Sequence, residues 1–276
     1  MNGSKLTTSA DIQPIYCIGD SHVSFFSGED AIQPGWPESA AQRLPWFRVF
    51  HIGPALAFSL SRANTTIRGR ERVFEVLDQA VPPGARVLLC FGEIDCRAHI
   101  LKQAAKQNLP VETVVATCLD SYFQAVREVQ ARGFEVIVYN AVPTRLTTPR
   151  KAKRDDDFIA VGSWQERNAA VRLFNSGARK RCADCGAKFL ENYPGLVDAN
   201  DKTIEWFCFD AIHLSQRAMP LTLRALAALY PEAGYPELPL PRPTALQRLL
   251  DRLQKRVRRW FKLPPPRRSG FQPEKA

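Results

Sequence analysis

The chain of 276 residues is 45% hydrophobic and 24% charged, which is an ordinary globular composition. Its formal net charge is +10, but residues 241–276 hold 11 of the 38 basic residues and only 2 of the 28 acidic ones. The remaining residues carry 27 basic and 26 acidic side chains, a net charge of +1. We therefore expect no nucleic-acid-binding fold, and only the basic C-terminal segment suggests an acidic partner.

Residues 1–14 contain one basic residue, Lys5, and no apolar run, so they predict an N-terminal extension and not a secretory signal. The sequence contains no run of 18 or more apolar residues, so we expect no segment that spans a bilayer. The seven cysteines are an odd number, and Cys17, Cys90 and Cys208 lie in apolar runs, where a free thiol packs as a small hydrophobe. These features predict a reduced cytoplasmic protein.

Short apolar runs alternate with helical patterns between residues 15 and 230. Strands are expected at residues 15–18, 47–52, 86–91 and 135–141, with a weaker one near 195–197. Helices are expected at residues 71–80, 111–132, 164–180 and 215–230. This alternation predicts one three-layer α/β/α domain, flavodoxin-like, around a mostly parallel five-stranded sheet. In such a domain the functional groups gather at the carboxyl ends of the strands.

The C-terminal part departs from this pattern. Residues 231–243 are rich in proline and predict a linker, after which Thr244 and Gln247 form a possible capping box. Residues 244–263 predict a basic amphipathic helix, and the last ten residues predict a disordered tail that completes the segment 244–276. Two roles remain open for this helix: packing on the domain, or binding an acidic partner or the anionic inner face of a membrane.

Two motifs at opposite ends of the predicted domain carry chemistry. Gly19, Asp20 and Ser21 follow the first strand, and Asp210 precedes His213 by three residues just before the last helix. A serine hydroxyl is a weak nucleophile that needs an imidazole base, which in turn needs a carboxylate to fix its tautomer. The motifs therefore predict Ser21, His213 and Asp210 as a catalytic triad. No serine lies in the G-x-S-x-G elbow of the alpha/beta-hydrolases.

Together these motifs resemble the SGNH (GDSL-type) hydrolase family over about residues 15–230. The resemblance implies two further blocks: a glycine after the second strand, which is Gly53 here, and a G-x-N-D block, whose place is taken by residues 92–95. It also implies hydrolysis of carboxylic esters through an acyl-enzyme, without a cofactor. The backbone N–H groups of Ser21 and Gly53 would hold the oxyanion, and small O-acyl groups on carbohydrates or lipids are plausible substrates.

The chain departs from the family pattern where Ile94 replaces the asparagine of the G-x-N-D block. Isoleucine offers no hydrogen-bond donor, and the loss of one oxyanion donor costs ~10²–10³ in rate. Arg97, Asn140 and His22 are possible replacements, while Glu93, Asp95 and Arg97 could instead form an ion-pair network. The predicted pocket comprises Asp20, His22, Gly92, Glu93, Ile94, Asp95 and Arg97.

Other interpretations remain beside the hydrolase. The same triad could transfer an acyl group to a surface polysaccharide, or the missing asparagine could mark a catalytically weak binding module. Cys182 and Cys185, combined with Cys96 and His99, resemble a zinc site, but the spacing favours ordinary thiols, and no metal is predicted. Residues 145–154 are expected to form a solvated loop over the site.

Overall fold

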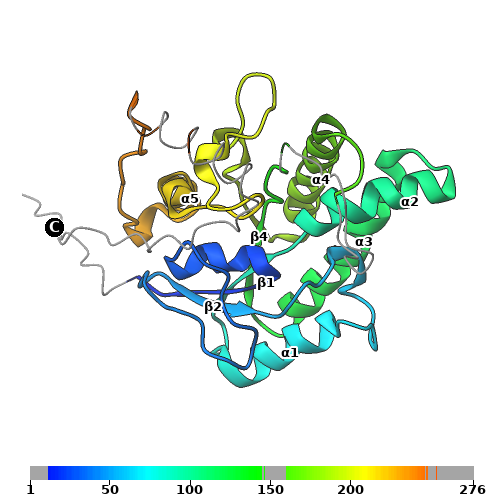
Figure 1. The fold of residues 1–276 in the computed structure, drawn as a ribbon. Coiled ribbons are helices and arrows are strands. Elements are labelled where there is room, and N and C mark those ends of the chain that lie inside the picture. Colours follow the sequence, from blue (N-terminus) through cyan, green and yellow to red (C-terminus); the bar gives the residue numbers. More distant parts are fainter. Residues whose placement is uncertain (1–11, 145, 147–159, 246, 248–252, 254–276) are drawn as a thin grey trace, which may run out of the picture.

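The computed structural model describes residues 12–144, 146, 160–245, 247 and 253. Five parallel strands form one sheet in the order β2-β1-β3-β4-β5, as in flavodoxin-like domains (Figure 1). The strands are β1 (Ile15–Gly19), β2 (Phe47–His51), β3 (Arg86–Cys90), β4 (Glu135–Tyr139) and β5 (Lys188–Leu190). The predicted fold class is confirmed, and every pairing in the sheet is parallel.

The central strands are buried on both faces. In β3, Val87 and Leu89 belong to one hydrophobic cluster, whereas Leu88 and Cys90 belong to the cluster on the opposite face. A strand that is covered on both sides has no polar face, so its sequence is a continuous apolar run. This is the physical reason why the inner strands β1, β3 and β4 were predicted from the sequence.

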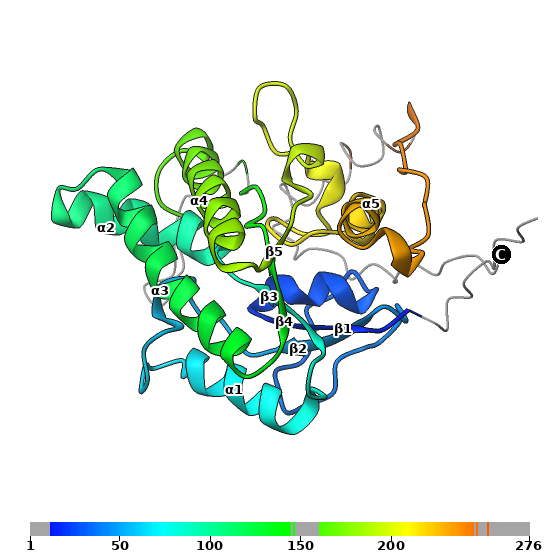
Figure 2. The same cartoon turned by 180° about the vertical axis from the view of Figure 1, so that it is seen from behind.

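Helices cover both faces of the sheet (Figures 1 and 2). They are α1 (Gly69–Ala80), α2 (Ile100–Gln107), α3 (Val111–Ala131), α4 (Trp164–Cys185) and α5 (Met219–Leu229). Helices α1, α3 and α4 contribute to one hydrophobic cluster, and α5 contributes to the other together with the 3-10 helix η2 (Ser21–Ser27). Helix α2, which continues a π-helical turn η4 (Asp95–His99), was not predicted.

Two predicted elements are corrected by the structure. The weak strand near residues 195–197 is wrong: the 3-10 helix η5 (Tyr193–Gly195) lies there, and β5 comes earlier. Leu196 is buried, so its apolar character reflects packing of a loop. The last helix begins at Met219 and not at residue 215, because the Ser215 side chain instead caps the short 3-10 helix η7 (Gln216–Ala218).

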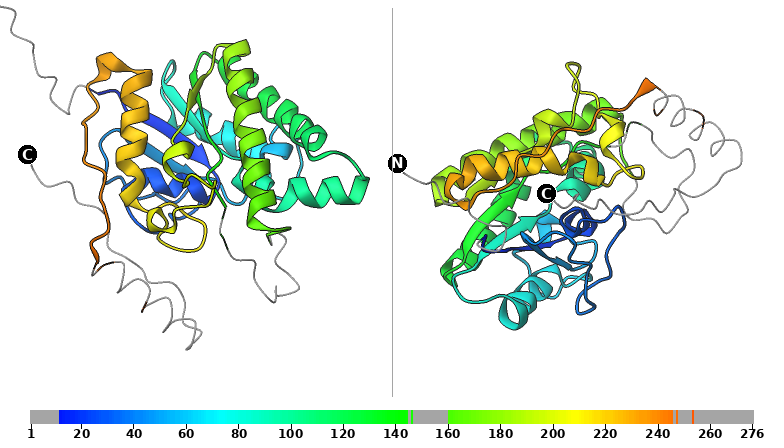
Figure 3. Two further views of the ribbon diagram at one scale, coloured as in Figure 1. Left: turned by 90° about the horizontal axis from the view of Figure 1, so that it is seen from above. Right: turned by 90° about the vertical axis from the view of Figure 1, so that its left-hand side faces the viewer.

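The packed body continues past residue 230. After the 3-10 helix η8 (Pro231–Ala233), Tyr235 is buried, and Leu238 and Leu240 pack against the cluster formed with α5 (Figure 3). The indole N–H of Trp206 donates to the carbonyl of Pro241 at 3.2 Å. Much of the predicted proline-rich linker therefore lies against the domain.

The predicted capping box is confirmed at the end of the described chain. The N–H of Gln247 donates to Thr244 Oγ1 at 3.1 Å, and the N–H of Thr244 donates to Gln247 Oε1 at 2.9 Å. Most of the predicted basic helix, most of the loop expected at 145–154 and most of the N-terminal extension lie outside the described residues. Within the described residues, every helix is too short or too polar to cross a membrane.

Candidate active site

The structure brings the three predicted triad residues together at the carboxyl edge of the sheet. Ser21 is the first residue of η2, directly beyond the end of β1, and His213 lies in the loop before η7 and α5. Ser21 Oγ lies 2.8 Å from His213 Nε2, and His213 Nδ1 lies 2.7 Å from Asp210 Oδ2. Two residues that are 192 positions apart in the sequence are thus in hydrogen-bond contact.

The hydrogen bonds around Asp210 fix the tautomer of His213. Burial would raise the pKa of Asp210, but hydrogen bonds from the His213 side chain and from backbone N–H groups hold it below its ordinary value. An ionised carboxylate only accepts hydrogen bonds, so His213 Nδ1 must carry the proton. The bare Nε2 is then left to accept the hydroxyl proton of Ser21, which is the arrangement that a general base requires.

The turn that carries Ser21 is built by its two neighbours. A Cβ on Gly19 would lie 2.3 Å from the carbonyl oxygen of Cys90, so only glycine lets β1 and β3 approach so closely at this point. Asp20 caps η2, because its Oδ1 accepts from the N–H of His22 at 2.8 Å. Burial, assisted by the charges of Glu93 and Asp95, raises the pKa of Asp20 well above its ordinary value.

A buried clamp joins the two halves of the triad. Asp30, just after η2, accepts hydrogen bonds from Ser215 Oγ at 3.0 Å and from the N–H of Gln216 at 2.6 Å. The Gln216 side chain also donates to the carbonyl of Phe25 at 2.7 Å. These bonds tie the segment after Ser21 to the segment after His213. Sequence reasoning missed the clamp, because nothing in the local sequence pairs Asp30 with residues 185 positions away.

The predicted backbone oxyanion donors lie at the ends of neighbouring strands. Gly53 follows β2, and the preceding residue, Ile52, donates its N–H to the carbonyl of Gly19 at 2.9 Å. Gly53 has a φ of 88°, in the region that favours glycine. Neither Ser21 nor Gly53 uses its backbone N–H in a hydrogen bond to another described residue. Both donors are therefore available to a ligand.

Ile94 is buried and provides no polar atom where the family pattern has an amide. Two of the predicted replacements are committed elsewhere. Arg97 Nε donates to both carboxylate oxygens of Glu93, at 2.9 and 3.1 Å, and Asn140 Nδ2 donates to the carbonyl of Ala141 at 3.0 Å. Both side chains are thus already engaged by groups of the protein.

His22, the third predicted replacement, lies beside the base. Its ring centroid is 4.7 Å from that of His213, and its Nε2 lies 3.0 Å from Glu93 Oε2. Burial lowers the pKa of His22 despite the opposing charge of Glu93. The neutral ring donates from Nε2 to the carboxylate, and its buried Nδ1 has no partner among the described residues.

The predicted ion-pair network exists in part. Although burial alone would raise it, the charge of Arg97 and the hydrogen bonds from His22 and Arg97 hold the pKa of Glu93 at about 2. Asp95 does not join this pair: its carboxylate accepts the N–H groups of Ala57 and Phe58 at 2.8 and 3.1 Å, at the 3-10 helix η3 (Ala57–Ser59). Burial raises the pKa of Asp95 to about 6. The predicted role of Asp95 in the network was wrong.

Two further residues at the site were not predicted. Phe209 stacks on the ring of His213, with centroids 5.7 Å apart and an interplanar angle of 18°. Arg72 of α1 donates from Nη1 to the carbonyl of Ile52 at 2.8 Å, beside Gly53. An aromatic residue in a loop and an arginine on a helix are common, so no sequence pattern indicates either role.

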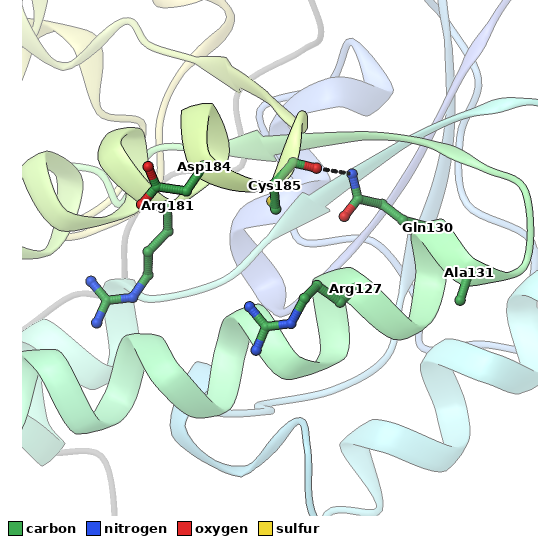
Figure 4. A pocket seen from close by; sticks show the side chains of 6 residues that line it. All are labelled: Arg127, Gln130, Ala131, Arg181, Asp184 and Cys185. Atoms are coloured by element: carbon green, nitrogen blue, oxygen red, sulfur yellow. Dashed lines mark hydrogen bonds between the residues drawn. The ribbon is translucent and has the colours of Figure 1, made fainter.

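A small cavity of about 10 Å³ lies at the carboxyl ends of β1, β3 and β4, lined in part by Asp20, His22 and Glu93. A second hollow lies between the C-terminal ends of α3 and α4 (Figure 4). In a parallel α/β domain these helix ends adjoin the amino ends of the strands, opposite the triad. The residues that line this second hollow are Arg127, Gln130, Ala131, Arg181, Asp184 and Cys185.

The cysteines considered as metal ligands lie on separate helices. Cys96 is buried in η4, whereas Cys182 and Cys185 lie on the last turn of α4. Across the described part of the chain, no group of three or more histidine, cysteine, aspartate or glutamate side chains has the arrangement of a metal site.

No protein-family model matches the chain, and no curated protein sequence matches it significantly. Solved structures with a similar fold include a GDSL-like lipase from Bacteroides thetaiotaomicron, with 10% identity, 83% of this chain and 93% of that chain covered, and a TM-score of 0.44. Another is phospholipase A1 from Streptomyces albidoflavus, with 17% identity, 79% and 99% covered, and a TM-score of 0.42. At these identities and scores the matches carry no weight in assigning a function. The assignment depends instead on the geometry of the triad.

Proposed function

We propose that the chain is a serine-dependent hydrolase of carboxylic esters of the SGNH type. The observation that carries the proposal is the continuous hydrogen-bonded chain from Asp210 through His213 to Ser21. An isolated serine or histidine has many structural uses, but this order of acceptor, base and hydroxyl at the carboxyl edge of a parallel sheet activates a nucleophile.

In the acylation step, Ser21 Oγ attacks the ester carbonyl while His213 Nε2 takes the hydroxyl proton. The Asp210 carboxylate stabilises the imidazolium that forms, because it accepts from Nδ1. The developing oxyanion accepts hydrogen bonds from the backbone N–H groups of Ser21 and Gly53. His213 then gives its proton to the departing alcohol, and the acyl group remains on Ser21 as an ester.

Water completes the cycle. His213 removes a proton from a water molecule, which attacks the acyl-enzyme carbonyl, and the proton then returns to Ser21 Oγ as the acid leaves. Small O-acyl groups on a carbohydrate or lipid are the substrates that we propose.

Labelling with a fluorophosphonate probe tests the proposal. Wild-type protein should form a covalent adduct and hydrolyse p-nitrophenyl acetate, whereas Ser21→Ala should do neither. His213→Ala and Asp210→Asn should lower turnover by at least ~10³-fold, because each removes part of the proton-transfer system. Ser24→Ala is the matched control, since Ser24 lies in the same 3-10 helix and its hydroxyl accepts from the backbone of Gln33 and from no other described group.

Folded wild-type protein that neither reacts with the probe nor hydrolyses esters would refute the hydrolase and favour a binding module. If the probe labels Ser21 but the acyl group passes to an added sugar faster than to water, the reaction would be acyl transfer. Thermal unfolding of each variant separates a loss of chemistry from a loss of fold.

A further inference from the structure

The peptide unit that joins Ile52 to Gly53 has one polar group on each side. The carbonyl oxygen belongs to Ile52, and the N–H, which has no protein partner among the described residues, belongs to Gly53. In a planar trans peptide these two groups point in opposite directions. Whatever holds the carbonyl therefore also fixes the direction of the N–H.

Arg72 holds this carbonyl. Its Nη1 donates to the Ile52 oxygen at 2.8 Å from the side of α1. A Cβ at position 53 would lie only 2.9 Å from the same nitrogen, so glycine is also what gives the guanidinium room to approach. No carboxylate among the described residues forms an ion pair with Arg72, and its positive charge is thus not neutralised locally.

We propose that Arg72 is a positioning residue for the oxyanion site, acting through the Ile52–Gly53 peptide. A charged donor on the carbonyl oxygen draws electron density from the amide and makes the N–H on its other side a stronger donor. The inference rests on the proposed function. It gains importance from Ile94, because a site without the side-chain amide depends on its backbone donors.

The inference predicts that loss of Arg72 weakens binding of the transition state and leaves binding of the substrate unchanged. In Arg72→Met, kcat for p-nitrophenyl acetate should fall by about tenfold while KM stays the same. The affinity for a trifluoromethyl ketone, which adds to Ser21 as an oxyanion, should fall by a similar factor. Arg72→Lys keeps a charged donor and should recover part of both losses.

The matched control is Arg70→Met. Arg70 lies two residues earlier on the same helix, but its guanidinium donates to Glu128 and not to the turn at Gly53. This variant should keep the wild-type kcat and ketone affinity. A merely structural role for Arg72 would lower the amount of folded enzyme and leave the kcat of the folded fraction and its ketone affinity unchanged.

Three outcomes would overturn the inference. If the wild type is active and Arg72→Met has the same kcat and ketone affinity, the inference is refuted while the proposed function stands. A change in the KM of Arg72→Met without a change in its kcat has the same meaning. If Arg72→Met does not fold, the same comparison is made with Arg72→Lys, whose kcat must then fall while KM stays constant. A wild type that the fluorophosphonate probe does not label would refute the proposed function, and this inference with it.

Discussion

Glu93 keeps a negative charge inside the domain, where it binds His22, whose ring lies beside that of His213. Its side chain is only 3% exposed and binds His22 on one side and Arg97 on the other. A buried carboxylate is costly unless such partners satisfy it, and the removal of one partner leaves the others buried and unpaired. The stability of the site should therefore depend on this single side chain.

We predict that Glu93→Gln lowers the free energy of unfolding at pH 7 by about 3 kcal/mol. It should also flatten the acid dependence of stability. The pKa of Glu93 is about 2 in the folded protein against an ordinary 4.5, so between these values the unfolded chain binds more protons. The stabilisation is present above pH 4.5 and is lost as the pH falls towards 2. Urea unfolding at several pH values measures both effects.

The control for this prediction is Glu29→Gln, which removes the carboxylate from the exposed pair between Glu29 and Arg43. Exposed ion pairs contribute only ~0–1 kcal/mol. A loss in Glu93→Gln no larger than that in Glu29→Gln would contradict the proposed importance of the buried charge.

At the scale of single residues, the sequence predicted the triad residues but not the residues that hold their surroundings in place. Ser21, Asp210 and His213 were found because each stands in a short motif whose residue types follow from the chemistry. Arg72 and Asp30 act through backbone groups that lie far from them in the sequence, so only folding reveals their partners. The catalytic roles of the triad remain predictions until the labelling experiment.

At the scale of elements, the turn after β3 depends on one glycine. Gly92 has a φ of 110°, and a Cβ there would lie 2.6 Å from two ring atoms of Phe174, which is fully buried on α4. A side chain at this position would meet both backbone strain and a steric clash with a residue that cannot move away.

We predict that Gly92→Ala lowers the free energy of unfolding by about 3 kcal/mol, since strain and overpacking add. Gly84→Ala is the control, because Gly84 also has a positive φ, of 75°, but a Cβ there has nothing within 4 Å. It should cost only ~1 kcal/mol, which is the strain alone. Equal losses in the two variants, measured by denaturant unfolding, would refute the contribution of Phe174.

The elements that the sequence predicted are those with long apolar runs or clear helical periodicity. β5 was missed because it has three residues and only Leu190 is fully buried, so its pattern is too short to recognise. α2 was missed because it has only eight residues, fewer than the ~10–12 at which a pattern can be recognised as a helix. In both cases the packing of neighbouring elements decides the structure more than local sequence does.

At the scale of the whole molecule, the charge is divided unevenly. Residues 244–276 carry 10 basic and 2 acidic side chains, whereas the domain is close to neutral. A polybasic segment is attracted to anionic lipid by about 1 kcal/mol per basic residue near the surface. We propose that this segment brings the domain to an anionic membrane surface.

Deletion of residues 244–276 should therefore abolish sedimentation with vesicles that contain phosphatidylserine. It should leave the turnover of a soluble ester unchanged, because Pro241, which accepts a hydrogen bond from Trp206, is retained. Binding of the full chain should weaken as salt rises from about 0.05 to roughly 0.5 M, since added ions screen the attraction between basic residues and anionic lipid. Equal vesicle binding by the shortened chain would refute the proposal.

The Asp30 clamp has a consequence for how the protein is made. Ser21 and Asp30 leave the ribosome early. Ser215 and Gln216, which donate hydrogen bonds to Asp30, leave it nearly two hundred residues later. A chain that lacks residues 210–216 would therefore hold Ser21 without the imidazole and the carboxylate that the proposed mechanism requires. In the proposed mechanism, Ser21 therefore becomes reactive only after residue 216 has been synthesised and has folded against η2.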